Sequence, residues 1–95
     1  MSLAKIQRKR LSLLMDYDML LLEKDMCAQS LDTTYHISKR DGLTDEVKKN
    51  IAEVYQVRQN KMTEIKANLT ITQRKLKFYK KMYKDKCRTL SLKLS

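Results

Sequence analysis

LDTTYHISKRDGLTDE, residues 31–46, contains the one interruption of helical patterning in the chain. β-Branched and turn-forming residues cluster in it around Asp41 and Gly42, and Gly42 is the single glycine of a sequence that has no proline. Because glycine and proline most often interrupt regular structure, we expect long helices on both sides. The sequence therefore predicts two helices joined by a connection at residues 31–43.

The second helix is predicted to run from Thr44 to about residue 93. The Thr44 side chain can accept a hydrogen bond from the first free N–H groups, and Asp45 and Glu46 follow in the first turn, where carboxylates interact favourably with the helix dipole. At 1.5 Å per residue this helix is roughly 75 Å long. Its length favours packing in a coiled coil or a helical bundle.

The first helix is predicted over about residues 2–30, which gives a length of roughly 43 Å. Folding back through the connection lays it antiparallel on the first half of the second helix, with Arg10 near residue 64. Residues 74–95 then form a basic overhang beyond the first helix. Residues 1–95 as a whole are predicted to be a single helical module of the all-α class, an antiparallel hairpin of two unequal helices.

Hydrophobic residues recur at intervals of seven along the second helix. They are Tyr55, Met62, Leu69, Leu76, Tyr83 and Leu90. A column of this kind is typical of a coiled-coil seam, but the companion column is half polar and includes Arg58 and Lys86. These polar positions indicate a seam that changes partners along its length. We assign Leu69, Leu76, Tyr83 and Leu90 to an interface with a partner chain.

The first helix has apolar residues on two faces when its sequence is projected at 100° per residue. One face consists of Leu11, Met15, Met19, Leu22 and Met26, and the other of Leu13, Leu14, Tyr17, Leu20, Leu21 and Cys27. The second helix of the same chain can cover only one of them. The sequence therefore predicts that the face from Leu11 to Met26 binds a protein partner, either another copy of the chain or a helical subunit of a larger complex.

The net charge of +10 is concentrated at the two ends of the 95-residue chain. Residues 1–10 contribute +4, residues 73–95 contribute +8, and residues 11–72 contribute −2. An antiparallel hairpin brings these two ends to one pole. The predicted basic patch consists of Lys5, Arg8, Lys9, Arg10, Lys77, Lys80, Lys81, Lys84 and Arg88.

The residues that carry chemistry do not form a recognisable catalytic or metal-binding pattern. His36 is the only histidine, and no arrangement of a nucleophile, a histidine and an acid is constrained by the sequence. Cys27 and Cys87 lack the CxxC spacing of a metal site and are too few for a disulfide framework, which favours a reducing compartment. We therefore expect a non-enzymatic protein without cofactors, located in the cytoplasm or the nucleus.

Three functions are compatible with this pattern. The first is assembly, in which the chain acts as a coiled-coil scaffold, an adaptor or a small subunit that associates with itself or with another protein. The second is nucleic-acid binding through the basic face of residues 74–88, where clustered Lys and Arg would contact phosphates. The third is adsorption of that amphipathic segment to an anionic membrane surface. We rank the functions in this order, with an acidic protein surface as a further ligand for the basic face.

Overall fold

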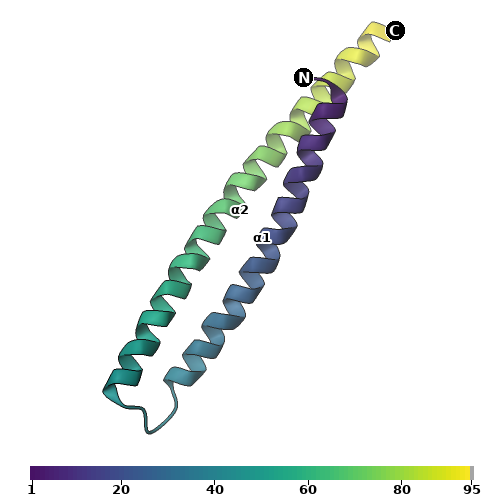
Figure 1. Ribbon diagram of the computed structural model, residues 1–95. Helices are drawn as coiled ribbons and strands as arrows, with labels where there is room; N and C mark the ends of the chain where they lie inside the picture. The colour runs from purple at the N-terminus through teal and green to yellow at the C-terminus, as the bar shows by residue number, and fades with distance from the viewer. Residues whose placement is uncertain (95) are drawn as a thin grey trace.

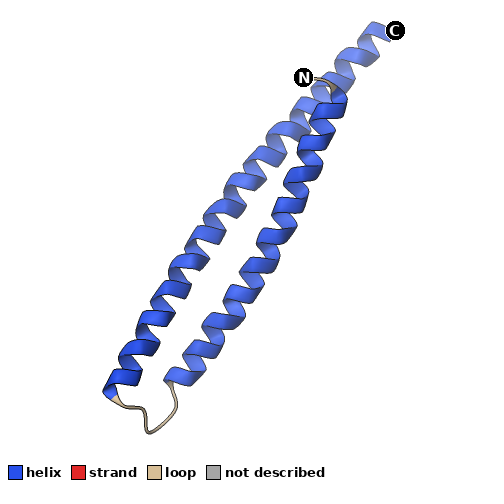
Figure 2. Cartoon of the chain, in the orientation of Figure 1, coloured by secondary structure: helices blue, strands red, loops and turns tan. Residues whose placement is uncertain are grey.

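The computed structural model describes residues 1–94 as two long antiparallel helices (Figure 1). Helix α1 comprises the 36 residues Leu3–Ser38, and helix α2 comprises the 50 residues Asp45–Leu94. Helix accounts for nearly all of the chain in Figure 2. The predicted all-α fold, a hairpin of two unequal long helices, is confirmed. Ser95, the last residue of the predicted overhang, lies outside the described residues.

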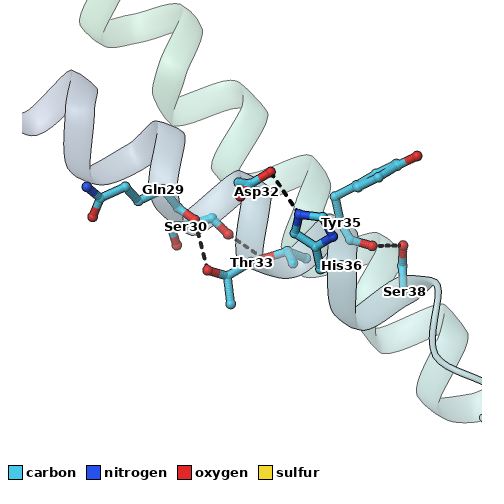
Figure 3. Close-up of polar contacts among 8 residues, drawn as sticks. Gln29, Ser30, Asp32, Thr33, Tyr35, His36 and Ser38 are labelled. Atoms are coloured by element: carbon cyan, nitrogen blue, oxygen red, sulfur yellow. Dashed lines mark hydrogen bonds and ion pairs between the residues drawn. The ribbon is translucent and has the colours of Figure 1, made fainter.

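The connection between the helices is shorter than predicted, because α1 continues to Ser38 and only residues 39–44 link it to α2. The prediction counted the β-branched and turn-forming residues after Leu31 against a helix. Their hydroxyl groups instead bond to the helix itself: Thr33 Oγ1 donates to the carbonyl oxygen of Gln29 at 3.0 Å, and Ser38 Oγ donates to that of Tyr35 at 2.5 Å (Figure 3). The predicted boundaries at residues 30 and 31 are therefore wrong.

Both helices begin at a side chain that caps their free N–H groups. Ser2 Oγ accepts a hydrogen bond from the Lys5 N–H at 3.3 Å, and Thr44 Oγ1 accepts one from the Val47 N–H at 3.3 Å. Thr44 is thus the predicted cap, and α2 begins one residue after it. Gly42 has a φ of 79°, which a residue with a Cβ adopts only with strain. This explains why the one glycine lies in the connection.

The buried and half-buried residues of each helix recur at alternating intervals of three and four. On α1 they include Leu3, Ile6, Arg10, Leu13, Tyr17, Leu20, Lys24, Cys27, Leu31 and Thr34. On α2 they include Ile51, Tyr55, Arg58, Met62, Ile65, Leu69, Thr72, Leu76, Tyr79 and Tyr83. This spacing keeps one face of each helix turned toward the other, so that both columns predicted from Tyr55 line the contact between α1 and α2 as far as Tyr83, whereas Lys86 and Leu90 are exposed.

The stagger of the two helices differs from the prediction. Gln7 Nε2 donates to Tyr83 Oη at 3.0 Å and Gln73 Nε2 donates to Tyr17 Oη at 3.1 Å, and in both pairs the residue numbers add up to 90. The prediction placed Arg10 near residue 64, for which the numbers add up to 74. The longer α1 and the shorter connection contribute to this shift, since the helix ends at Ser38 and Asp45 add up to 83, whereas the predicted ends at residues 30 and 44 add up to 74.

The overhang beyond α1 is correspondingly short. Tyr83 contacts Gln7 and so lies within the paired part of the hairpin, which corrects the predicted start of the overhang at residue 74. The residues from Arg88 to Lys93 are all exposed, and the C-terminal turns of α2 project past the N-terminus in Figure 1. The molecule measures 77 × 15 × 14 Å, and its radius of gyration is 21.5 Å. A compact chain of this length would have a radius of gyration of about 12 Å.

We predict that replacing Ile65 by Ala lowers the free energy of unfolding by about 2–5 kcal/mol, because the side chain is removed from a closed seam and leaves a cavity. Ile65 is 2% exposed. Ile71 of the same helix is 47% exposed and provides the matched control, since Ile71→Ala should change the free energy by no more than about 0.5 kcal/mol. Urea unfolding followed by circular dichroism measures both, and equal losses would contradict this assignment of the core.

Candidate partner interface and basic pole

A polar cluster joins the two helices near the connection. Arg58 Nη1 donates to the carbonyl oxygen of Ser30 at 3.1 Å and also to Thr34 Oγ1. The Thr34 hydroxyl donates to the same Ser30 carbonyl at 2.8 Å, and Cys27 Sγ lies 3.4 Å from the carbonyl oxygen of Arg58. Within residues 1–94 no buried side-chain nitrogen or oxygen lacks a hydrogen-bond partner. Arg58 is therefore a satisfied part of the hairpin and does not require a second chain.

The predicted partner face of α1 is exposed along its whole length. Its five side chains are between 54% and 62% exposed, and they are Leu11, Met15, Met19, Leu22 and Met26. We call these five residues the outer row. Of the other predicted face, Leu13, Tyr17, Leu20 and Cys27 are half-buried toward α2, whereas Leu14 and Leu21 stay exposed. The hairpin thus covers one side of α1 and leaves the outer row open.

The residues assigned to the seam of α2 lie mostly inside the hairpin. Leu69 is buried, and Leu76 and Tyr83 are half-buried at the inward positions that face α1. Only Leu90, which is 39% exposed, remains accessible. Leu69, Leu76 and Tyr83 thus pack against α1 of the same chain, because α1 extends along α2 as far as Tyr83. That the four residues also meet a partner chain stays a prediction.

Acidic side chains flank the outer row. Residues 16–32 contain five exposed acids and one base, and the acids are Asp16, Asp18, Glu23, Asp25 and Asp32. The base, Lys24, is half-buried at an inward position. Asp32 Oδ1 lies 3.3 Å from His36 Nε2 (Figure 3), and the other four acids take part in no ion pair within the described part of the chain. The outer row is therefore an apolar strip with a negative border.

The basic residues of the two chain ends meet at the end of the hairpin that lies opposite the connection. We call the following residues the basic pole: Lys5, Arg8, Lys9, Arg10, Arg74, Lys75, Lys77, Lys80, Lys81, Lys84, Lys86, Arg88 and Lys93. All are exposed except Arg10, which is half-buried. The two ion pairs found within residues 1–94, Asp32 with His36 and Lys61 with Glu64, include none of them.

Contacts between the helices hold the two halves of the basic pole together. The Arg10 guanidinium lies 5.4 Å from the centre of the Tyr83 ring, a distance at which a cation is attracted to an aromatic face. A shallow groove nearby is lined by Lys9 and Asp16 of α1 and by Arg74 and Lys75 of α2, among others. Cations from sequence segments more than sixty residues apart thus share one surface.

The aromatic residues of the basic pole differ in accessibility. Tyr79 and Tyr83 are half-buried toward α1, and the Tyr83 hydroxyl accepts a hydrogen bond from Gln7. Phe78 is 57% exposed, and its ring contacts that of Tyr79 edge to face. A single aromatic ring is therefore well exposed at the basic pole. The apolar face of this segment, which a membrane-binding helix would use, is largely occupied by α1.

The partners of Arg58 were missed from the sequence. Ser30 and Thr34 lay at or beyond the predicted end of the first helix, so they were not considered as inward positions. A usable signal was present, since Leu31 and Thr34 continue the alternation of three and four that runs through Lys24 and Cys27. Extending this spacing by one heptad would have placed Thr34 on the inner face of the hairpin.

Residues 1–94 contain neither a cluster of metal ligands nor a helix that could span a membrane. No group of three or more His, Cys, Asp or Glu side chains is arranged to hold a metal ion. Neither α1 nor α2 combines the length and the apolar character that crossing a membrane requires. No protein-family model, curated protein or solved structure matches the chain.

We predict that Arg58→Ala lowers the free energy of unfolding by about 1.5–3 kcal/mol, because hydrogen bonds from a charged donor to Ser30 and Thr34 are lost. Arg74, which is exposed on the same helix, provides the control, and its replacement by Ala should cost no more than about 0.5 kcal/mol. Urea unfolding measures both values. An Arg58 variant as stable as the Arg74 variant would show that the cluster does not stabilise the hairpin.

Proposed function

We propose that the chain is a non-enzymatic protein–protein interaction module that binds a helix of a partner protein along the outer row of α1. This proposal rests on one observation. Five large apolar side chains, each more than half exposed, lie on the side of α1 that α2 does not cover. Their spacing of three or four residues matches one face of a helix. A partner helix packed on this face would complete a bundle.

The extended shape of the chain supports assembly. The accessible surface is 7699 Å². A compact monomer of the same mass is expected to expose about 5700 Å². Fully burying a large apolar side chain contributes about 1.5–3 kcal/mol, so the outer row offers a large driving force for association, from which the cost of immobilising the partner must be subtracted.

The charge around the outer row indicates the chemistry of the partner. A second copy of the chain packed through the same row would oppose acids to acids, because Asp16, Asp18 and Glu23 lie around the middle of the row whichever way the second helix runs. A helix with an apolar stripe and basic borders would instead form complementary pairs. We therefore propose that the outer row binds a basic amphipathic helix of a different protein.

This proposal is tested with two synthetic peptides of about four heptads, both with Leu at the a and d positions and with either Lys or Glu at the e and g positions. The Lys peptide should bind the chain, and the Glu peptide should bind at least about tenfold more weakly, because only the first complements the acidic border. Fluorescence anisotropy of the labelled peptides measures both affinities.

The outer row itself is tested by Met15→Gln, Met19→Gln and Leu22→Gln combined in one variant. We expect a loss of affinity for the Lys peptide of at least about tenfold, since the buried apolar contact disappears while glutamine preserves the helix. The matched control replaces Val47, Val54 and Val57 by Gln. These are three exposed apolar residues of α2, and this variant should bind the Lys peptide with unchanged affinity. Equal binding by the two variants would contradict the proposal, as would self-association of the unmodified chain through the outer row in sedimentation equilibrium.

A further inference from the structure

We propose that the basic pole is a second binding site, separate from the outer row, that takes the phosphate backbone of double-stranded nucleic acid without sequence preference. The basic pole has thirteen cationic residues, four from the start of α1 and nine from the end of α2. Asp85 is the one acid in these two segments, residues 1–10 and 73–95. A surface with this excess of exposed positive charge attracts polyanions.

A stripe along α2 provides the principal contact. Lys77, Lys80, Lys81, Lys84 and Arg88 follow one another at intervals of one, three or four residues, which keeps them on one side of the helix. The stripe covers about 17 Å of helix axis. Over that length a double helix presents about ten phosphate charges, since one occurs every 1.7 Å. On α1, Arg10 lies against the Tyr83 ring, and Lys9 shares a groove with Arg74 and Lys75.

The structure favours a double helix over a single strand. Proteins that bind single strands stack successive bases on aromatic side chains. At the basic pole Tyr79 and Tyr83 are half-buried toward α1, which leaves Phe78 as the one well-exposed ring among the described residues of this surface. Contacts to phosphates remain available, and a duplex has the higher charge density.

The structure also favours nucleic acid over an anionic membrane. Membrane adsorption of an amphipathic helix requires its apolar face to enter the lipid. The apolar face of residues 76–87 includes Leu76, Tyr79, Tyr83 and Cys87, all of which are half-buried in the hairpin. The cations of the stripe are exposed, whereas these apolar residues are half-buried. This arrangement favours contact between the cations and phosphates over insertion of the helix into lipid.

The test titrates a labelled duplex of about 20 base pairs with the full chain at about 50 and about 200 mM salt, following fluorescence anisotropy. If the five cations of the stripe all contact phosphates, the slope of log affinity against log salt is about −4.5, and the affinity falls about 500-fold between the two conditions. The single strand of the same sequence should bind more weakly. A slope of smaller magnitude than about 2, or absence of binding at the lower salt concentration, would overturn the proposal.

Two variants with the same change in charge locate the site. Replacing Lys77, Lys80, Lys81, Lys84 and Arg88 by Gln should lower affinity at least about 100-fold at the lower salt and reduce the magnitude of the slope by about 4.5. The control replaces Lys48, Lys49, Lys61, Lys66 and Arg40 by Gln, again four lysines and one arginine, all exposed and outside the basic pole. We expect less than about a fivefold loss for the control.

Equal losses of duplex affinity in the two variants would overturn the proposal, because binding would then depend on the net charge of the chain and not on a particular site. Flotation with vesicles of neutral lipid, with and without anionic lipid, provides the remaining comparison. Binding to anionic vesicles in the absence of duplex binding would assign the basic pole to membranes and would also overturn it. Because the outer row is unchanged in both charge variants, binding of the Lys peptide is measured independently of this result.

Discussion

The hydrogen bonds from Arg58 to Ser30 and Thr34 fix how the two helices are staggered. A partly buried guanidinium requires oxygen atoms, and it finds them at the Ser30 carbonyl and the Thr34 hydroxyl. Sliding α1 by one heptad would bring Arg58 level with Lys24 in one direction and with the end of α1 in the other. The first arrangement opposes two cations, and the second takes Arg58 away from the Ser30 carbonyl and the Thr34 hydroxyl. Apolar residues spaced by heptads would tolerate a shift by one heptad in either direction. The polar contact of Arg58 therefore distinguishes the observed stagger from the two shifted ones.

This stagger is the reason that the two basic ends of the chain lie together. With Arg58 level with α1 residues near Leu31, the heptads place Tyr83 beside the first turns of α1, where Gln7 and Arg10 contact it. Bringing cations together costs electrostatic free energy, which the apolar seam and the Tyr83 contacts must offset. An arrangement in which like charges are held together by other interactions favours the binding of anions, since an anion relieves the repulsion.

The sequence predicted the helical hairpin and the heptad columns of α2 because both depend on local periodicity. It assigned Leu69, Leu76 and Tyr83 to a partner chain, and it did not predict that they pack against α1. It did not predict the end of α1, since Thr33, Thr34 and Ile37 disfavour a helix locally and are stabilised by contacts that propensity does not include. Arg58 was interpreted as a break in the seam for the same reason. Its partners lie 24 and 28 residues away in the sequence, so periodicity along α2 could not reveal them. The outer row was identified correctly as apolar and exposed because α1 has more apolar residues than one neighbour can bury.

The two proposed surfaces should act almost independently. The outer row is centred near Met19, and the stripe of the basic pole is centred near Met82, which the observed stagger places level with residues close to Gln7. The separation is about twelve residues of helix, or roughly 18 Å. This exceeds the Debye length of about 8 Å at physiological ionic strength, so a basic helix centred on the outer row would hardly alter the potential at the stripe. The two surfaces come closest at the groove that Asp16 shares with Lys9, Arg74 and Lys75. The two proposals are therefore compatible, since a protein partner on the outer row and a polyanion on the stripe would occupy different parts of the molecule.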